Sequence, residues 1–230
     1  VPLQQNVGLG AAMNAGLAHC REPYVARMDS DDLCDHERFA EQWRVLRERP
    51  EIDCLSSWQA DFEYDPAQTF RVKTVPETHD QIVRVLRWRN AIPHPSIVVK
   101  RDMLLRVGGY RAVLYLEDYD LFLRLVAEGA RLYAIQQPLI HVRVTHRQRL
   151  RRGGWQYAVR DMKFRWSLYR DGHISLFNCC VTMLVYSGFR LAPPSLKQCM
   201  YSTVRRTRPS GEEPASLGTV GSVSPPTAYS

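Results

Sequence analysis

Three aspartates, Asp29, Asp31 and Asp32, fall within four positions of the segment RMDSDDLCDHER, residues 27–38, directly after the apolar run 24–26. Like charges packed this closely repel one another, by roughly 1 kcal/mol per pair in water and by more in a partly dry cleft. Such a cluster either is solvated as an acidic turn or binds a hard divalent cation through a nucleotide diphosphate. The residues alone leave both interpretations open.

Two familiar explanations of clustered acids fit this segment poorly. An EF-hand calcium loop needs an oxygen ligand at its fifth position and glycine at its sixth, but counting from Asp29 these positions hold Leu33 and Cys34. A helix N-terminus, which favours carboxylates at the positive end of its dipole, explains Asp35 and Asp32. It does not explain Asp29, so the segment favours a bound cation.

A second acidic group lies in YLEDYDLFLRL, where Glu117, Asp118 and Asp120 stand at the mouth of an amphipathic helix. Helix capping explains Asp118 equally well when it is taken alone. Two acidic groups on separate loops could also have two different functions. One would hold metal and phosphate, and the other would remove a proton from an acceptor hydroxyl.

The composition limits how much structure can surround these groups. The chain has 230 residues, of which 45% are hydrophobic, enough for one domain of ordinary size plus a tail. The formal net charge is +7 and its positive excess comes late, which indicates an anionic partner for the C-terminal half, either lipid headgroups or nucleic acid. The six cysteines show no C-x-x-C spacing and no signal peptide is evident, so we expect a reducing cytosol and no zinc.

Strand and helix signals alternate along the chain, which predicts an α/β layered sheet. Acidic residues at the carboxyl end of a strand would face the crevice where open sheets bind ligands. Asp35 is expected to cap the second helix. The expected helices are 8–19, 36–48, 78–89, 101–107 and 118–128, and the expected strands are 23–28, 53–62, 69–73, the segment HPSIVV at 94–99, and 131–136.

Five ordered segments resemble family 2 glycosyltransferases of the GT-A fold, the bacterial polysaccharide type. They are NVGLGAAMNAG, ARMDSDDLCDHERFAEQ, NAIPHPSIVVKRDMLLRVGGY, LEDYDLFLRL and VRVTH, between about residue 6 and residue 146. The resemblance implies a nucleotide-diphospho-sugar transferase domain over residues 1–150, with a mixed sheet flanked by helices. The family's first strands would precede Val1, so we expect an N-terminally truncated domain.

The resemblance also implies an enzyme. Its reaction would be inverting transfer of a sugar from a nucleotide-sugar donor to a saccharide or lipid-linked acceptor in cell-surface polysaccharide synthesis, with Mn²⁺ or Mg²⁺ as cofactor. Asp29 and Asp31 resemble the D-x-D pair of metal ligands, with Asp29 nearer the ribose or sugar, and Asp32 would be a supporting carboxylate. Asp118 matches the catalytic base, and Glu117 would support it or touch the acceptor.

Five further positions match the family less directly. Gly8 and Asn14 match the loop that closes on the nucleotide. His94 matches a position near the sugar and the acceptor, although a hydrogen-bonded loop histidine explains it equally well. Arg143 resembles the late R-x-H element that meets the diphosphate, but the spacing here is R-x-x-H, so His146 departs from the pattern.

Two other classes of protein stay open. A metal-dependent nucleotidyltransferase also uses clustered carboxylates, but the glycine- and lysine-rich phosphate loop it needs is not evident in the sequence. A catalytically inactive truncated remnant would keep the fold and act only as a binding module. Among mechanisms of transfer, no second nucleophile is evident, which favours a single inverting displacement over a covalent intermediate.

The sequence changes character after residue 153. Helical patterns at 154–170 and 174–190 predict a helical, membrane-associated extension over 151–206, and Ser, Pro, Gly and Thr predict a disordered tail over 207–230. The apolar stretch ISLFNCCVTMLVYSGF is shorter than the roughly 20 residues of a spanning helix. Its flanking arginines favour a helix in the interface of the cytoplasmic leaflet, at the inner face of the plasma membrane, and no nucleic-acid partner. A helix that covers the catalytic core is the alternative.

Overall fold

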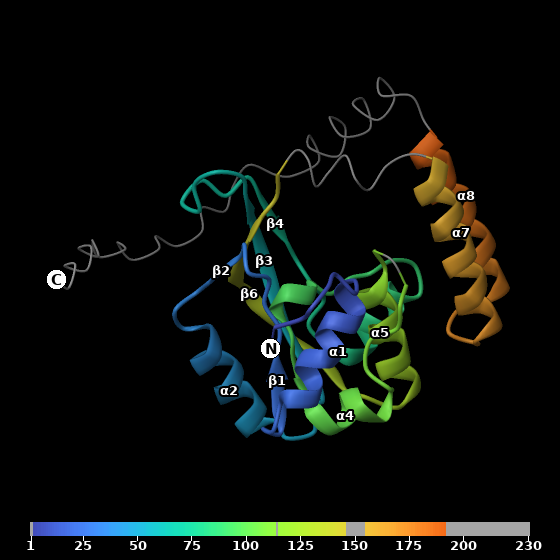
Figure 1. Ribbon diagram of the computed structural model, residues 1–230. Helices are drawn as coiled ribbons and strands as arrows, with labels where there is room; N and C mark the ends of the chain where they lie inside the picture. The colour runs from blue at the N-terminus through green and yellow to red at the C-terminus, as the bar shows by residue number, and fades with distance from the viewer. Residues whose placement is uncertain (1, 114, 146–154, 192–230) are drawn as a thin grey trace. The chain divides into compact units, whose positions relative to one another are not determined.

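The computed structural model describes residues 2–113, 115–145 and 155–191 (Figure 1). His146 and the predicted tail at 207–230 lie outside the described residues. The strands are β1 (Tyr24–Ala26), β2 (Leu33–Cys34), β3 (Cys54–Phe62), β4 (Arg71–Lys73), β5 (Val98–Lys100) and β6 (Leu132–Arg143). The helices are α1 (Leu9–His19), α2 (Arg38–Glu48), α3 (His79–Leu86), the 3₁₀ turn η1 (His94–Ser96), α4 (Arg101–Arg106), α5 (Glu117–Ala127), α7 (Trp155–Arg170) and α8 (Leu176–Leu191).

The strands form one mixed sheet in the order β1-β5-β3-β6-β2, with β4 paired to β3. β3 and β6 are parallel, while β1 and β3 each run antiparallel to β5. β1, β3 and β6 therefore point the same way, and their carboxyl ends meet at one edge. The predicted mixed sheet flanked by helices is confirmed, and the acidic loop after β1 lies at that edge.

The sheet is covered on both faces because its buried strands are apolar at successive positions. Leu55 of β3 and Val98 of β5 pack on Val45 of α2, whereas the neighbouring Cys54 and Val99 belong to the larger core on the other face. Figure 1 shows α2 on one side of the sheet and α1, α4 and α5 on the other. Full burial on two faces is what alternating side chains of a central strand allow.

Several predicted boundaries were wrong for local reasons. The segment predicted as a strand at 94–99 begins as the 3₁₀ turn η1 and becomes strand only at Val98, because prolines lack the N–H that a sheet ladder requires. α2 begins at Arg38 rather than 36, and Asp35 caps the preceding turn by accepting the Glu37 N–H at 2.9 Å. β6 continues past 136 because Pro138 falls at a register shift, where its missing N–H costs no ladder bond.

The two C-terminal helices were predicted at 154–170 and 174–190 and occur at Trp155–Arg170 and Leu176–Leu191. One face of this pair belongs to the core, since Phe164 and Cys179 join the cluster that contains Tyr119 of α5. The alternative of a core-covering helix is therefore right for this face. In the described ranges, no helix combines the length and the apolar character needed to cross a bilayer.

Candidate active site

Asp32 links the acidic loop to the end of β6. Its Oδ1 accepts the backbone N–H of Arg143 at 3.1 Å, across 111 positions of sequence. Burial raises the pKa of Asp32 to about 7, repulsion from Asp29 and Asp31 adds to this rise, and the Arg143 N–H opposes it. The second oxygen, Oδ2, is buried and has no partner within the described structure. An uncompensated carboxylate oxygen beside two more aspartates fits a divalent cation.

The other two aspartates are more accessible than Asp32. Asp31 is exposed, and the half-buried Asp29 forms an ion pair with Arg27. Among the residues that the structure describes, no three His, Cys, Asp or Glu side chains converge as a metal cage. The loop alone therefore offers an incomplete coordination sphere, which additional oxygen ligands would have to complete.

Two arginines that the sequence analysis did not single out support the acidic loop. Arg38 is fully buried, and its Nη2 donates to the Arg27 carbonyl at 3.0 Å while its Nε donates to Gln42 Oε1 at 3.1 Å. Burial lowers the pKa of Arg38. Arg27 and Arg38 each keep one buried nitrogen without a hydrogen-bond partner. The sequence could have indicated both arginines as site residues, because they lie inside the acidic segment 27–38.

Asp118 lies at the start of α5, where a neutral amide holds its carboxylate. Asn90 Nδ2 donates to Asp118 Oδ2 at 2.7 Å, and the Tyr119 backbone N–H donates to Oδ1 at 2.8 Å. The neighbouring Glu117 is buried, and this burial raises its pKa. Asn90 was missed as a site residue, although it opens the quoted segment NAIPHPS.

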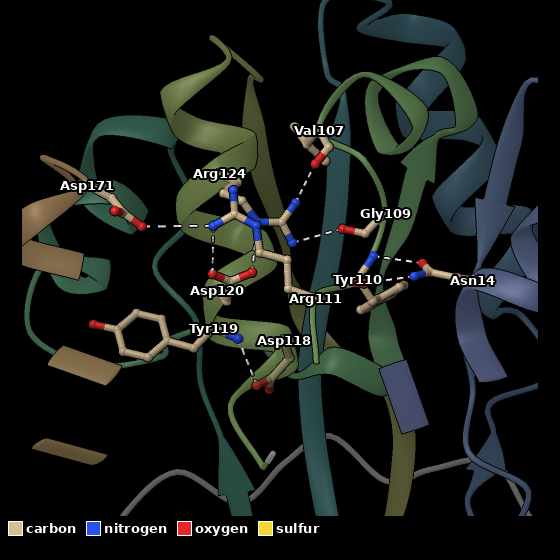
Figure 2. A network of polar contacts seen from close by, with 10 residues as sticks. All are labelled: Asn14, Val107, Gly109, Tyr110, Arg111, Asp118, Tyr119, Asp120, Arg124 and Asp171. Atoms are coloured by element: carbon tan, nitrogen blue, oxygen red, sulfur yellow. Dashed lines mark hydrogen bonds and ion pairs between the residues drawn. The ribbon is translucent and has the colours of Figure 1, made fainter. Parts of the chain in front are cut away.

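Asp120, two residues further along α5, has a structural role. Figure 2 shows its carboxylate beside Arg124, whose Nε contacts Oδ2 at 2.7 Å. Arg124 also donates to the carbonyls of Val107 at 2.6 Å and Gly109 at 2.8 Å. Arg111 approaches the same carboxylate at 3.8 Å. Asp120 thus fixes the turn before α5, and of the three acids only Glu117 and Asp118 stay candidates for catalysis.

His94 and Asn14 are joined through Tyr110. His94 Nε2 and the Tyr110 hydroxyl are 2.9 Å apart, and burial lowers the pKa of His94 well below its usual range, so the ring is neutral. The Asn14 amide pairs with the Tyr110 backbone through two 2.7 Å hydrogen bonds (Figure 2). Gly109, at φ 65°, allows this approach, because an added Cβ would overlap Asn14 Oδ1. Asn14 therefore positions Tyr110, and its predicted contact with the nucleotide stays a prediction.

Gly8 directly precedes α1, and Arg143 is the last residue of β6. Gly8 precedes α1 with a φ of 83°, which favours glycine. The Arg143 guanidinium stacks on the Phe62 ring at 4.8 Å and donates to the Glu63 carbonyl at 3.4 Å. Their predicted contacts with the donor stay predictions.

The charges of these groups act on one another, so the predicted residues share one region. Arg27 affects the pKa of Asp32 and also that of His94. It also affects Tyr110, whose pKa in turn responds to Asp118. Contacts also join these parts: the Arg27 N–H donates to the Ile97 carbonyl at 3.0 Å, directly after η1, and the His94 ring meets Phe122 of α5 with the centroids 6.1 Å apart. The acidic loop, the buried histidine and α5 are therefore taken as one candidate site, which could bind a metal and phosphate at one end and accept a proton at the other.

A solved structure identifies the fold. The mannosyltransferase PcManGT from Pyrobaculum calidifontis, in complex with GDP-Man and Mn²⁺, superposes with a TM-score of 0.52 at 16% sequence identity. The alignment covers 89% of this chain but only 61% of that chain, less than two thirds. A likeness at this identity establishes the fold alone, which is the GT-A glycosyltransferase fold predicted from the sequence.

Sequence relatives identify the family. The family described as Glycosyl transferase family 2 matches residues 1–106. The UDP-Gal:alpha-D-GlcNAc-diphosphoundecaprenol beta-1,3-galactosyltransferase of Escherichia coli is 34% identical over 204 residues, which cover 89% of this chain and 74% of the relative. The amylovoran biosynthesis glycosyltransferase AmsE of Erwinia amylovora is 32% identical over 209 residues, covering 90% and 77%. The chain belongs to glycosyl transferase family 2, as the resemblance implied.

Proposed function

We propose that this chain transfers a sugar from a nucleotide-sugar donor to a saccharide or lipid-linked acceptor in the synthesis of a cell-surface polysaccharide. One observation carries the proposal: the buried Asp32 Oδ2 lacks a partner in the described structure and lies beside Asp29 and Asp31, at the edge where β1 and β6 end. Two relatives favour the same chemistry, since one is named for transfer to GlcNAc-diphosphoundecaprenol and the other for amylovoran biosynthesis.

The acidic loop fits a cation that the donor helps to hold. Asp31 and Asp29 would bind Mn²⁺ or Mg²⁺, with Asp32 as the supporting carboxylate. The ion would act as a Lewis acid that neutralises charge on the leaving diphosphate. PcManGT is described in complex with GDP-Man and Mn²⁺, which supports a divalent ion here.

Asp118 is the proposed general base. Its carboxylate removes the proton from the acceptor hydroxyl as that oxygen attacks the anomeric carbon. Asn90 orients the carboxylate by donating to one oxygen at 2.7 Å, and Glu117 supports it or touches the acceptor. Neutral His94 would contact the sugar or the acceptor, and Arg143 would contact the diphosphate. Attack on the face opposite the leaving group inverts the anomeric configuration in one step.

The metal site makes a prediction of its own. Because a pair of aspartates supplies few ligands, Mn²⁺ should bind weakly alone and at least about tenfold more tightly once UDP or GDP is present. Titration calorimetry with MnCl₂ alone, and then with each nucleotide, measures this gain. Asp31→Asn should remove the gain, whereas Asp102→Asn, at an exposed aspartate of α4, should keep it. Nanomolar binding of Mn²⁺ alone would contradict the shared site.

A turnover assay distinguishes the three classes of function. The chain is incubated with Mn²⁺ and, in separate reactions, with a panel of UDP-, GDP- and dTDP-sugars or with nucleoside triphosphates, and the released products are identified. Release of a nucleoside diphosphate, slowed by Asp31→Asn, is the expected result. Release of inorganic diphosphate from nucleoside triphosphates would instead identify a nucleotidyltransferase. Binding of donors without turnover would identify a remnant that acts only as a binding module.

The surface of α7 and α8 supports peripheral membrane contact as a second part of the proposal. α8 exposes Phe177, Leu184 and Val185, at 70%, 78% and 58% of their surfaces. The acidic residue of α7, Asp161, is buried against Arg165 at 2.9 Å. The exposed residues of α7 are aromatic, basic or neutral: Trp155, Gln156, Arg160, Lys163, Trp166 and Arg170. Apolar and basic surface side by side suits the anionic cytoplasmic leaflet, so we place the protein at the inner face of the plasma membrane.

A further inference from the structure

Arg27 directly follows β1, and one ion pair holds its side chain beside the acidic loop. Its Nη2 contacts Asp29 Oδ1, whereas its Nη1 is buried and has no hydrogen-bond partner within the described residues. Arginine often binds a carboxylate through two parallel hydrogen bonds, so this ion pair uses the guanidinium only in part. In the proposed mechanism Arg27 has no role.

The backbone of Arg27 is fixed independently of its side chain. Its N–H donates to the Ile97 carbonyl at 3.0 Å, and its carbonyl accepts a hydrogen bond from Arg38 Nη2 at 3.0 Å. A substitution of the Arg27 side chain leaves both of these bonds in place. Because the side chain is only 12% exposed, the guanidinium remains beside the acidic loop even without Asp29 as its partner.

Asp29 is the accessible member of this ion pair. Its side chain is 40% exposed, so a cation from solvent can reach its carboxylate. A divalent ion bound by Asp29 would lie close to the Arg27 guanidinium, and two cations at short range repel one another. Asp29 therefore has two competing partners, which are Arg27 and the metal.

We propose that Arg27 pairs with Asp29 while the donor site is empty and binds the diphosphate of the donor once Asp29 binds the metal. This inference rests on the proposed function and adds a donor-binding residue to it. Release from Asp29 leaves both terminal nitrogens of Arg27 without a partner, and guanidinium nitrogens bind phosphate oxygens through charge-assisted hydrogen bonds.

This exchange of partners makes the metal and the donor bind together. Metal alone has to displace Arg27 from Asp29 and leaves a buried guanidinium uncompensated, which costs free energy. When the diphosphate is also present, Arg27 gains a new anionic partner and this cost is removed. Arg27 thus gives a second reason, besides the small number of aspartate ligands, for weak binding of the metal by itself.

Calorimetry on Arg27→Gln in the full 230-residue chain tests the exchange, because two effects of opposite sign are expected. MnCl₂ alone should bind this variant about tenfold more tightly than the wild type, since the competing cation is gone. The gain in Mn²⁺ affinity on addition of UDP or GDP should fall about tenfold, since the diphosphate loses its guanidinium partner. A variant with a merely disordered loop would instead bind Mn²⁺ alone more weakly.

Two matched variants serve as controls for this titration. Arg27→Lys keeps the positive charge, so Mn²⁺ alone should bind it as weakly as it binds the wild type. Arg44→Gln changes an exposed arginine of α2 that pairs with Glu41 and Glu48, and it should leave both the affinity for Mn²⁺ and the gain with nucleotide unchanged.

A second measurement, in EDTA, detects the released arginine without any metal. Asp29→Asn removes the ionic partner of Arg27, whereas Asp31→Asn removes the same charge from the loop and keeps the ion pair between Arg27 and Asp29. UDP or GDP should therefore bind Asp29→Asn at least about fivefold more tightly than Asp31→Asn. Adding Arg27→Gln to Asp29→Asn should abolish this advantage. The comparison of the two asparagine variants decides the question even if Arg27→Gln does not fold.

Two results would overturn the proposal: binding of Mn²⁺ alone by Arg27→Gln that is no tighter than by the wild type, or equal nucleotide binding by Asp29→Asn and Asp31→Asn in EDTA. Release of nucleoside diphosphate from nucleotide sugars by the wild type reports on the proposed function separately. If the wild type releases nucleoside diphosphate but either of the two results is found, this inference alone is contradicted. If nucleotide gives the wild type no gain in Mn²⁺ affinity, both the shared donor site and this inference are contradicted.

Discussion

Asp118 and Asp120 stand two residues apart at the start of α5, yet their surroundings give them different chemistry. Arg124 Nε donates to the buried Asp120 Oδ2 at 2.7 Å and neutralises its charge. Asp118 instead accepts a hydrogen bond from the neutral amide of Asn90. The first pair can be predicted from the sequence, because residues four apart on a helix are neighbours. The Asn90 contact spans 28 positions and depends on how α3 packs against α5, so the sequence alone gives no sign of it.

Changing Asp118 to asparagine tests the proposed base. The amide keeps the shape of the side chain but cannot accept the proton, so sugar transfer should fall by a factor of about 100 to 10,000 while donor binding stays nearly intact. Transfer rate and donor affinity are measured separately, with exposed Asp102→Asn as the control. Transfer at the wild-type rate would move the base to Glu117 or elsewhere.

His94 should make stability depend on pH below about 6.5. Burial lowers the pKa of His94 in the folded chain, so on acidification the unfolded chain takes up a proton that the folded chain refuses. Stability therefore falls as the pH falls from 7.5 to 5.5, and it falls more in the wild type than in His94→Gln. Urea unfolding of both proteins at the two pH values measures the difference. His19→Gln changes an exposed histidine and serves as the control. If the wild type and His94→Gln lose the same stability between the two pH values, the His94 ring is protonated in the folded chain.

At the scale of elements, the sequence predicted most helices and strands within a few residues but not how the strands pair. The spacing of apolar residues within one segment predicts a helix without knowledge of the rest of the chain, so α3 and α5 were predicted correctly. The pairing of two-residue β2 with β6, Leu33 to His141, joins residues far apart in sequence, and β2 was not predicted at all. This short strand closes the acidic loop and sets Asp32 against Arg143. The residue types of the site were therefore predictable, whereas the contact that buries one of its three acids was not.

Arg124 should stabilise the fold through the turn that it holds. Arg124→Met removes the partner of buried Asp120 and the donors to the Val107 and Gly109 carbonyls. We expect a loss of roughly 3 to 5 kcal/mol in the free energy of unfolding, as is usual when one partner of a buried pair is deleted. Urea unfolding measures the loss. Arg44→Ala, which breaks an exposed pair of α2, should change little, and an equally small effect of Arg124→Met would show that the buried network is not stabilising.

At the scale of the whole molecule, α7 and α8 have two different surfaces. Phe164, Leu168 and Cys179 belong to the core that α5 shares, so these helices are part of the folded domain. Phe177 and Leu184 are exposed on the other surface, 70% and 78% respectively. Sequence reasoning offered a membrane helix and a core helix as alternatives, but a single amphipathic helix can satisfy both. Whether α8 is also membrane-associated depends on whether its exposed surface binds lipid.

We therefore predict that the chain co-sediments with liposomes rich in anionic lipid and that added salt weakens this binding. Phe177→Asp with Leu184→Asp removes the apolar contact and should leave most of the protein in the supernatant. Lys163→Gln should weaken binding about fivefold, since each basic residue near the surface contributes about 1 kcal/mol. Tyr64→Asp changes a side chain that is 86% exposed in the turn after β3, and it should sediment as the wild type does. If the intact chain stays in the supernatant at low salt, or if the Phe177 and Leu184 variants sediment fully, α8 does not contact the membrane.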